Sequence, residues 1–161
     1  MKSRTHSSRI MGEVTIIIPV KDEEVGLEFL LDDYRSSSLK ELHDVTFIFV
    51  IDKRTSDSSK KIASEFSENV IDQEETTGKG SAVRQAIDEW RKNPTQMIVF
   101  LDADGSYSFD SVSKILESLQ EGADLVSGSR FLSGQGRPEG MSRLHNFGNR
   151  VLSAISSVRN R

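Results

Sequence analysis

The sequence predicts an α/β fold with a mainly parallel sheet flanked by helices. Short runs of β-branched and aromatic residues recur along the chain with little polar alternation, which is typical of strands buried on both faces. Amphipathic helical patterns lie between these runs, and this alternation is the signature of parallel strands joined by crossover helices. A length of 161 residues is enough for one domain with a substantial core.

Five strands and five helices are expected in alternation. The strands are Val14–Val20, Val45–Ile51, Asn69–Asp72, Met97–Leu101 and Asp124–Val126. The helices carry the apolar stripes Leu27–Tyr34, Ile62–Phe66, Ala82–Trp90, Val112–Leu119 and, from about Arg143, Leu144–Val158. Asp110 is expected to cap the fourth helix and Gly122 to close it.

Composition excludes several classes of protein. The chain has no cysteine, so a disulfide scaffold, a thiolate metal site and a cysteine nucleophile are excluded. The apolar runs are far shorter than the roughly 20 residues of a membrane span. A net charge of −4 argues against bulk nucleic-acid binding. Residues 1–12 are expected to form a flexible leader, and 13–161 a single domain.

Polar side chains follow the predicted strands, where a parallel sheet places its ligand crevice. The run Met97–Leu101 delivers Asp102 and Asp104 into this crevice. Alternate residues of an extended chain project to the same side, so the two carboxylates are expected to converge. Carboxylate oxygens suit Mg²⁺ or Mn²⁺, which would complete its shell with water and substrate phosphates. The alternative is structural: Asp102 ends the strand, and Asp104 starts a turn with Gly105.

Three further positions at this edge have both a functional and a structural interpretation. Gly78-Lys79-Gly80 opens a helix whose N-terminus can bind an anion, or it is a glycine-rich loop with a solvated lysine. Asp52 can accept hydrogen bonds from a base or ribose, or it caps the end of its strand. Arg130 can clamp a phosphate with two parallel hydrogen bonds, or it lies on the surface.

Five segments in a fixed order carry a family resemblance. They are Thr15–Glu24, Gly78–Arg84, Phe100–Ser106, Gly122–Phe131 and Gly148–Arg150. Together they resemble the family 2 glycosyltransferases of the GT-A fold, in particular the dolichyl-phosphate mannose and glucose synthases. The resemblance implies a GT-A Rossmann-like three-layer sandwich, with a mainly parallel central sheet between helices.

The resemblance also implies roles for individual residues. The nucleotide-sugar pocket would be lined by Pro19, Val20, Lys21, Glu23, Asp52, Lys79, Asp102 and Ala103. Asp102 and Asp104 would hold a divalent metal, Mg²⁺ or Mn²⁺. Asp104 and Arg130 would act in catalysis, with Arg130 facing a donor or acceptor phosphate. Ser106 stands where some relatives have a metal-contacting glutamine.

The chain departs from the family pattern in two places. Within Asp52–Ser59, Lys53 replaces a carboxylate and Ser58 replaces a glycine, which affects the expected base and ribose contacts. The sequence also stops before the Gly-Phe-Arg-type segment that completes the acceptor site in relatives, and before their membrane helices. We therefore expect an N-terminal portion that lacks the C-terminal part of the family domain.

The implied reaction is an inverting, metal-dependent transfer of a hexose from a nucleotide diphosphate sugar (GDP- or UDP-hexose) to a polyprenyl phosphate. A phosphate acceptor is already anionic and needs no general base, and no base candidate stands out in the sequence. Two alternatives remain open. One is a haloacid-dehalogenase-type phosphatase with Asp102 as nucleophile. The other is a non-catalytic module that binds a nucleotide sugar.

The uneven charge adds an expectation about membranes. Residues 137–161 carry five arginines and one glutamate, a net charge of +4, which leaves −8 for residues 1–136. The final helix is therefore basic and amphipathic. It can lie on an anionic membrane and guide a lipid phosphate, or it packs as an ordinary helix. The first interpretation places the full-length protein at the cytoplasmic face of a membrane.

Overall fold

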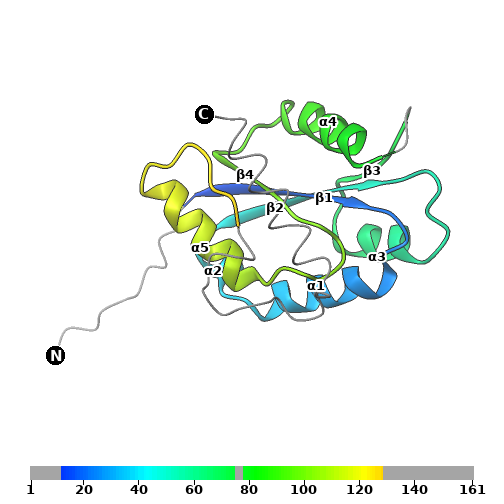
Figure 1. Cartoon of the computed structure of the whole chain (residues 1–161), viewed down its shortest axis with the longest axis horizontal. Coiled ribbons are helices and arrows are strands. Elements are labelled where there is room, and N and C mark those ends of the chain that lie inside the picture. The colour runs from blue at the N-terminus through cyan, green and yellow to red at the C-terminus, as the bar shows by residue number, and fades with distance from the viewer. Residues whose placement is uncertain (1–11, 75–77, 129–161) are drawn as a thin grey trace, which may run out of the picture. The chain divides into compact units, whose positions relative to one another are not determined.

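The computed structural model describes residues 12–74 and 78–128 (Figure 1). The chain divides into two compact units, Met1–Val126 and Ser127–Arg161, and every element described below belongs to the first. Arg130 and the final helix expected from about Arg143 lie outside the described residues. A single domain over residues 13–161 stays a prediction.

Four strands form one parallel sheet in the described part of the chain. They are β1 (Glu13–Val20), β2 (Asp44–Ile51), β3 (Val70–Asp72) and β4 (Met97–Phe100). Their order across the sheet is β3-β2-β1-β4, with every neighbouring pair parallel. Each strand lies within one residue of its predicted bounds. The register pairs Val20 with Ile51 and Ile51 with Asp72, so these strands end along the same edge.

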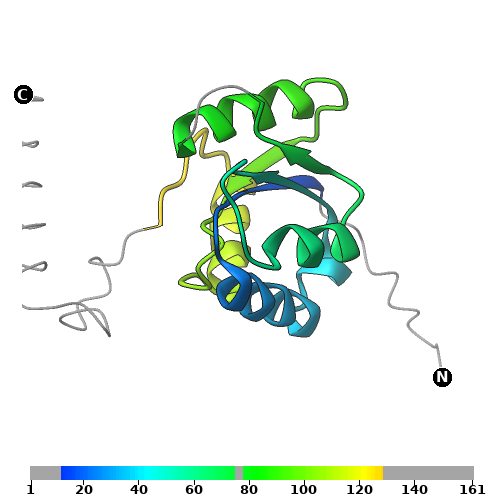
Figure 2. The ribbon, with the colours of Figure 1, turned by 90° about the vertical axis from the view of Figure 1, so that its right-hand side faces the viewer.

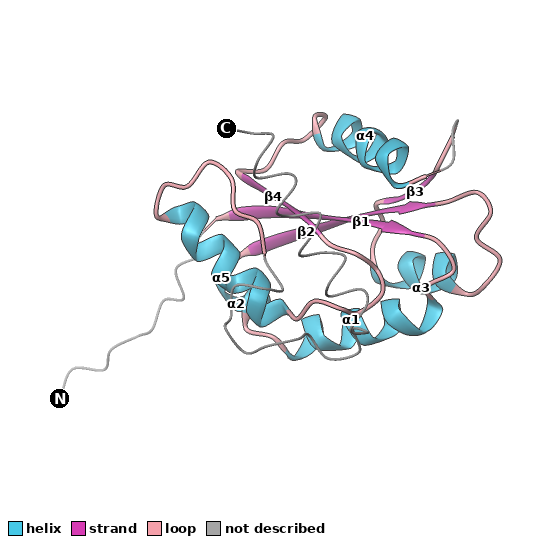
Figure 3. Cartoon of the chain, viewed as in Figure 1, coloured by secondary structure: helices cyan, strands magenta, loops and turns pink. Residues whose placement is uncertain are grey.

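Helices cover both faces of this sheet. They are α1 (Glu24–Ser36), α2 (Leu39–Leu42), α3 (Ser59–Phe66), α4 (Lys79–Trp90) and α5 (Phe109–Gln120). Figures 1 and 3 show α4 on one face of the sheet, and α1, α3 and α5 on the other. The perpendicular view in Figure 2 shows the same three layers, with the sheet between α4 and the remaining helices.

Strand alternation produces two apolar layers, one on each face. Ile16 and Ile18 of β1 join the larger cluster under α1 and α5, which includes Leu27 and Phe109. Ile17 points the opposite way, into a smaller cluster with α4 residues. The side chains of successive strand residues project to opposite faces, so one apolar run supplies both layers. The predicted α/β class, with a parallel sheet flanked by helices, is confirmed.

The fifth predicted strand is wrong. Residues Asp124–Val126 form no ladder with any strand of the described chain, and Leu125 is 88% exposed. The run is three residues long and only Val126 is β-branched, so few apolar contacts favour adding it to the sheet. The sequence alone could not distinguish this short apolar run from a buried strand.

The cap of α5 also differs from the prediction. Ser108, not Asp110, is the N-cap residue, and its Oγ accepts a hydrogen bond from the Ser111 N–H at 3.4 Å. Asp33 of α1 accepts a second bond from the Phe109 N–H at 2.7 Å. Asp110 instead lies in the first turn, where an acidic side chain favours the helix dipole. Gly122 follows the helix with a φ of 106°, as expected of a closing glycine.

Helix α2 was not predicted, because four residues are too few to show a helical period. Within residues 12–74 and 78–128, no helix has the length and apolar character needed to cross a bilayer.

Candidate active site

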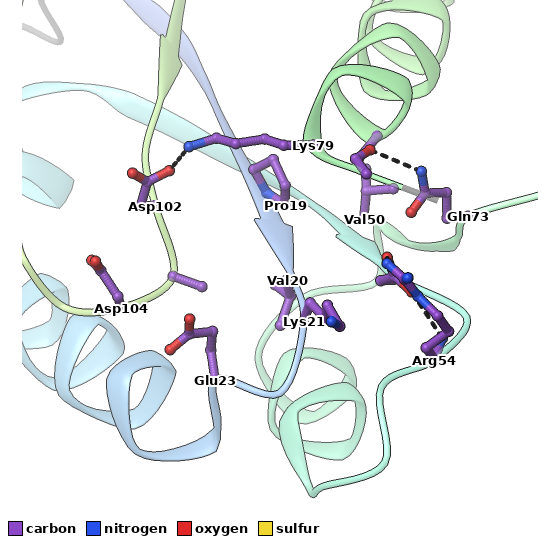
Figure 4. A pocket seen from close by; sticks show the side chains of 14 residues that line it. Pro19, Val20, Lys21, Glu23, Val50, Arg54, Gln73, Lys79, Asp102 and Asp104 are labelled. Carbon is purple, nitrogen blue, oxygen red and sulfur yellow. Dashed lines mark hydrogen bonds and ion pairs between the residues drawn. The ribbon is translucent and has the colours of Figure 1, made fainter. Parts of the chain in front are cut away.

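A pocket of about 320 Å³ opens at the carboxyl edge of the sheet, within the first unit (Figure 4). Its lining residues are Pro19, Val20, Lys21, Glu23, Val50, Asp52, Arg54, Gln73, Gly78, Lys79, Ala82, Asp102, Ala103 and Asp104. Nine of the ten site residues expected from the sequence are among them, and the tenth, Arg130, lies outside the described residues. Segments more than 80 residues apart in the sequence therefore meet in one cavity, because parallel strands bring their carboxyl ends together.

Asp104 lies in a turn just after β4, and Asp102 lies between the end of the strand and that turn. Strand β4 ends at Phe100, and Asp104 Oδ1 accepts a hydrogen bond from the Ser106 N–H at 2.9 Å. Gly105 follows with a φ of 70°, a conformation that favours glycine. The extended chain assumed in the prediction therefore ends before Asp104, and both carboxylates line the pocket.

Lys79 is the first residue of α4, and its side chain reaches toward Asp102. Its ammonium forms an ion pair and hydrogen bond with Asp102 Oδ1. Gly78 is the N-cap of α4, with a φ of 116°, so the predicted helix start at Gly78-Lys79-Gly80 is confirmed. The buried Gln73 side chain, just after β3, donates from Nε2 to the Gly78 carbonyl at 3.1 Å. This bond ties the glycine-rich helix start to the sheet.

Asp52, at the end of β2, is held by the neighbouring Arg54. The Arg54 Nε and backbone N–H each donate to Asp52 Oδ1 at 2.9 Å, and Arg54 Nη2 donates to Asp52 Oδ2 at 2.8 Å. Hydrogen bonds from the guanidinium, and then from the Arg54 backbone, hold the pKa of Asp52 well below its usual range. Lys21 adds a smaller lowering effect. The carboxylate stays ionised at neutral pH, and its oxygens already have protein partners.

The loops after β1 and β2 are joined by reciprocal side-chain caps. Asp57 Oδ2 accepts from the Glu24 N–H at 2.9 Å, and Asp57 Oδ1 accepts from the Ser59 N–H at 3.0 Å. Ser59 Oγ also accepts from the Glu23 N–H at 2.9 Å, and in return Glu24 Oε2 accepts from the Ser58 N–H at 3.1 Å. Each loop therefore satisfies the first N–H groups of the other loop's helix, which fixes the two loops relative to each other.

Gly26 is a positioning residue that the sequence analysis missed. A Cβ at this position of α1 would lie 2.7 Å from both the Ala103 carbonyl oxygen and the Asp104 Cα. Only glycine lets α1 approach the Asp104 turn this closely, and a Cβ at Gly105 would in turn lie 3.3 Å from the Gly26 carbonyl oxygen. The available signal was a glycine inside an amphipathic helical pattern, which costs about 1 kcal/mol relative to alanine and calls for a packing reason.

Charge is divided across the pocket. Figure 4 shows Glu23, Asp102 and Asp104 on one side and Arg54 on the other. Among the described residues, no group of three or more His, Cys, Asp or Glu side chains could hold a metal by itself. Two carboxylates at one end of a cavity still fit Mg²⁺ or Mn²⁺, because these ions commonly bind through one or two carboxylates and share the rest of their shell with phosphates and water.

The sequence of this chain is similar to those of known glycosyltransferases. It is 32% identical over 140 residues to glycosyltransferase AglJ of Haloferax volcanii, covering 87% of this chain and 43% of AglJ. It is 26% identical over 125 residues to a polyprenol monophosphomannose synthase of Mycolicibacterium smegmatis, covering 74% of this chain and 45% of that protein. The chain thus spans less than half the length of either relative.

A solved structure supports the fold. Glucosyl-3-phosphoglycerate synthase from Mycobacterium tuberculosis, in complex with Mn²⁺, uridine diphosphate and phosphoglyceric acid, superposes with a TM-score of 0.54. The match covers 70% of this chain and 40% of that protein, at 17% identity. The expected GT-A fold is therefore confirmed. Residues 15–159 also match glycosyl transferase family 2, which is most of the sequence. The chain belongs to glycosyl transferase family 2.

Proposed function

We propose that this protein transfers a hexose, with inversion, from a nucleotide diphosphate sugar to a polyprenyl phosphate, with the help of a divalent cation. One observation carries the proposal: nine residues picked out by the family motifs line a single pocket at the carboxyl edge of the sheet. The polyprenol-phosphate acceptor is supported by the name of the mycobacterial relative, and the nucleotide and metal by the ligands of the solved neighbour.

The donor diphosphate would lie between Lys79 and the Asp104 turn. The first N–H groups of α4 and the Lys79 ammonium can together bind an anion at this place. Lys79 now pairs with Asp102, so a phosphate that attracts the ammonium would release the carboxylate. The helix start and the acidic turn therefore suit the same ligand.

The residues present fit a divalent cation. Asp102 and Asp104 offer hard oxygen ligands beside the place argued for the diphosphate. A cation bound there would act as a Lewis acid that neutralises the charge accumulating on the departing diphosphate. Asp102 and Asp104 would hold that cation, and Gly26 would keep the Asp104 turn against α1.

The acceptor half of the proposal depends on charge. A phosphate monoester is already an oxyanion, so it can attack the anomeric carbon without first losing a proton to a base. Inversion follows if this attack comes from the face opposite the departing diphosphate. Arg130 would face a donor or acceptor phosphate, but it lies outside the described residues, so this role rests on the sequence motif alone.

Calorimetric titration tests the donor half. Nucleoside diphosphates are titrated into the chain with and without Mn²⁺, using the wild type and Asp104→Asn. We expect binding that needs Mn²⁺ and that weakens at least about tenfold in Asp104→Asn, because one of two metal ligands becomes neutral. Asp88→Asn is the matched control, since Asp88 lies on α4 and pairs with Arg91 outside the pocket lining. Equal binding without Mn²⁺, or by Asp104→Asn, would contradict the proposal.

A transfer assay tests the acceptor half. A labelled nucleotide hexose is incubated with a short polyprenyl phosphate, or with the matching neutral polyprenol. We expect label on the phosphate only, with inverted anomeric configuration. Donor binding without transfer would instead favour a non-catalytic nucleotide-sugar module. The phosphatase alternative has no support from the family match, and a phosphoryl group trapped on Asp102 is the result that would restore it.

A further inference from the structure

We propose that Arg54 reads the nucleobase of the donor through the adjacent N7 and O6 acceptors of guanine, and that Asp52 orients Arg54 for this role. The inference rests on the proposed function, because it requires a nucleotide in the pocket. It makes Arg54 a specificity-determining residue. The family motif draws attention to Asp52 as the direct partner of the base, whereas the geometry gives that contact to the arginine.

The Asp52 carboxylate is covered by Arg54. Three hydrogen bonds of 2.8–2.9 Å reach its two oxygens from the Arg54 side chain and backbone. The Asp52 side chain is 7% exposed, whereas the Arg54 side chain is 51% exposed. A ligand that enters from solvent therefore meets the guanidinium, and the carboxylate lies behind it.

Arg54 keeps a second hydrogen-bonding fork beyond this pair. A guanidinium carries five N–H groups in one plane. The contacts with Asp52 use the Nε–H and one Nη2–H. The other Nη2–H and one Nη1–H run parallel along the end of the group, which suits two adjacent acceptors. Because Asp52 already fixes the plane of the guanidinium, little rotamer freedom is left to lose when a ligand binds.

The fork lies at the end of the pocket away from the acidic turn. Figure 4 shows Arg54 on the opposite side from Asp102 and Asp104, and all three residues line the same cavity. A nucleoside diphosphate with its phosphates at the acidic turn would thus extend its base toward Arg54. Arg54 and Lys21 line the cavity together with Asp52, so the two positive side chains outnumber the one carboxylate at this end.

The donor-only character of arginine selects among the bases. Guanine presents two neighbouring acceptors, N7 and O6, which match a bidentate arginine. Adenine places an amino donor beside N7, so one N–H of the fork would face another donor. Uracil has an N–H between its carbonyl groups that needs an acceptor, whereas the exposed Arg54 fork offers donors only. Guanine is therefore the base that this end of the pocket fits best.

The test compares GDP with 7-deaza-GDP, in which a C–H replaces the N7 acceptor. Both are titrated calorimetrically in Mn²⁺, together with UDP and inorganic pyrophosphate, into the wild type, Arg54→Gln and Arg54→Lys. A good bidentate contact discriminates by roughly 1–3 kcal/mol, so we expect the wild type to bind GDP about tenfold more tightly than 7-deaza-GDP or UDP. In Arg54→Gln the ratio of GDP to 7-deaza-GDP affinity should fall to about one, and in Arg54→Lys it should fall as well, because lysine lacks the planar fork that Asp52 orients. Pyrophosphate binding should stay unchanged, because it does not reach Arg54.

Two controls separate base reading from general effects. Arg54→Lys keeps the positive charge and loses the fork, so a purely electrostatic role would preserve the wild-type ratio in this variant. Arg91→Gln makes the same change as Arg54→Gln on an arginine outside the pocket lining, and it should keep the wild-type ratio. Should Arg54→Gln fold poorly, Asp52→Asn, which keeps the shape of the side chain but removes the charge that orients Arg54, should also lower the ratio.

The possible failures are distinguishable. If GDP and 7-deaza-GDP bind the wild type equally well, or if Arg54→Lys keeps the preference, the role of Arg54 is overturned while the proposed function stands. If no nucleoside diphosphate binds in Mn²⁺, the proposed function itself fails, and the inference fails with it.

Discussion

The two ends of the pocket are held in place in different ways. At the Arg54 end, hydrogen bonds between charged and polar side chains hold the loops in place. Arg54 binds Asp52, and Asp57 and Ser59 cap the start of the neighbouring helix α1. At the acidic end, the turn that bears Asp104 is positioned by packing, since the backbone of α1 lies directly against it at Gly26.

This difference predicts different sensitivities. Hydrogen-bonded loops lose stability in steps, because one bond can be removed while the others remain. A close contact between two backbones cannot be weakened in steps, because any atom added at the contact must displace the turn. Substitutions at the acidic end should therefore affect metal-dependent binding most, and substitutions at the Arg54 end should act on base choice or on stability.

Gly26→Ala should have the largest effect. Its Cβ would lie 2.7 Å from the backbone of the Asp104 turn, and overpacking of this kind costs roughly 1–3 kcal/mol. We expect Mn²⁺-dependent binding of GDP to weaken at least about tenfold, with the GDP to 7-deaza-GDP ratio unchanged, because the nearest atoms to the added Cβ belong to Ala103 and Asp104 and not to Arg54. Calorimetry measures both quantities.

Gly80→Ala is the stability control for this substitution. A Cβ at Gly80 in α4 would meet no atom within 4 Å, so the change should leave the free energy of unfolding the same or raise it by about 0.4–1 kcal/mol. Denaturant unfolding of the two variants compares the sites directly. If Gly26→Ala binds Mn²⁺ and GDP like the wild type, the acidic turn does not depend on this contact.

The elements of the fold were predictable because local periodicity records burial. The β1 run has an apolar residue at almost every position, and both faces of that strand are covered, so its sequence pattern and its environment agree. The pocket residues were predictable for a related reason. A polar residue such as Asp52, directly after a buried strand, can only lie at the carboxyl edge of the sheet.

The contacts that position the site were not predictable, because they join segments far apart in the sequence. Gly26 matters only because α1 crosses the turn at Asp104, and nothing local encodes that approach. Asp33 caps α5 from 76 residues away, so the local pattern favoured Asp110 instead. Arg54 was overlooked since its importance depends on where its guanidinium lies relative to Asp52, which is a matter of rotamer and not of residue type.

Asp57→Asn should have an intermediate effect, on stability and on its pH dependence. Asparagine keeps one acceptor oxygen but replaces the other by an NH₂ donor, so one of the bonds from the Glu24 and Ser59 N–H groups is lost, at a cost of roughly 1 kcal/mol. Hydrogen bonds from the Ser59 side chain, and then from backbone N–H groups, lower the pKa of Asp57. A lowered pKa means that the ionised form stabilises the folded state above the ordinary pKa of about 4 and that this contribution is lost as the pH falls below it.

Urea unfolding from pH 7 to pH 3 measures this contribution. We expect the wild type to be more stable than Asp57→Asn at pH 7, and the difference to shrink as the pH falls below about 4. Asp88→Asn is the control, since Asp88 forms an exposed pair with Arg91 and should show no such trend. A difference that stays constant with pH would mean that the charge of Asp57 does not stabilise the joined loops.

Lys79→Met should have the smallest effect, and its sign differs between two ligands. The Lys79 side chain is 63% exposed, and an exposed ion pair contributes only about 0–1 kcal/mol, so the free energy of unfolding should hardly change. Without Lys79, Asp102 loses a competing cation, and Mn²⁺ alone should bind up to about fivefold more tightly. GDP in the presence of Mn²⁺ should bind more weakly, because the diphosphate loses a positive partner.

Lys92→Met, which removes an exposed lysine paired with Glu89, should change neither affinity. If Lys79→Met instead weakens Mn²⁺ binding alone, Lys79 does not compete with the metal for Asp102, and the acidic end of the pocket is organised by Gly26 and its turn without help from the helix start.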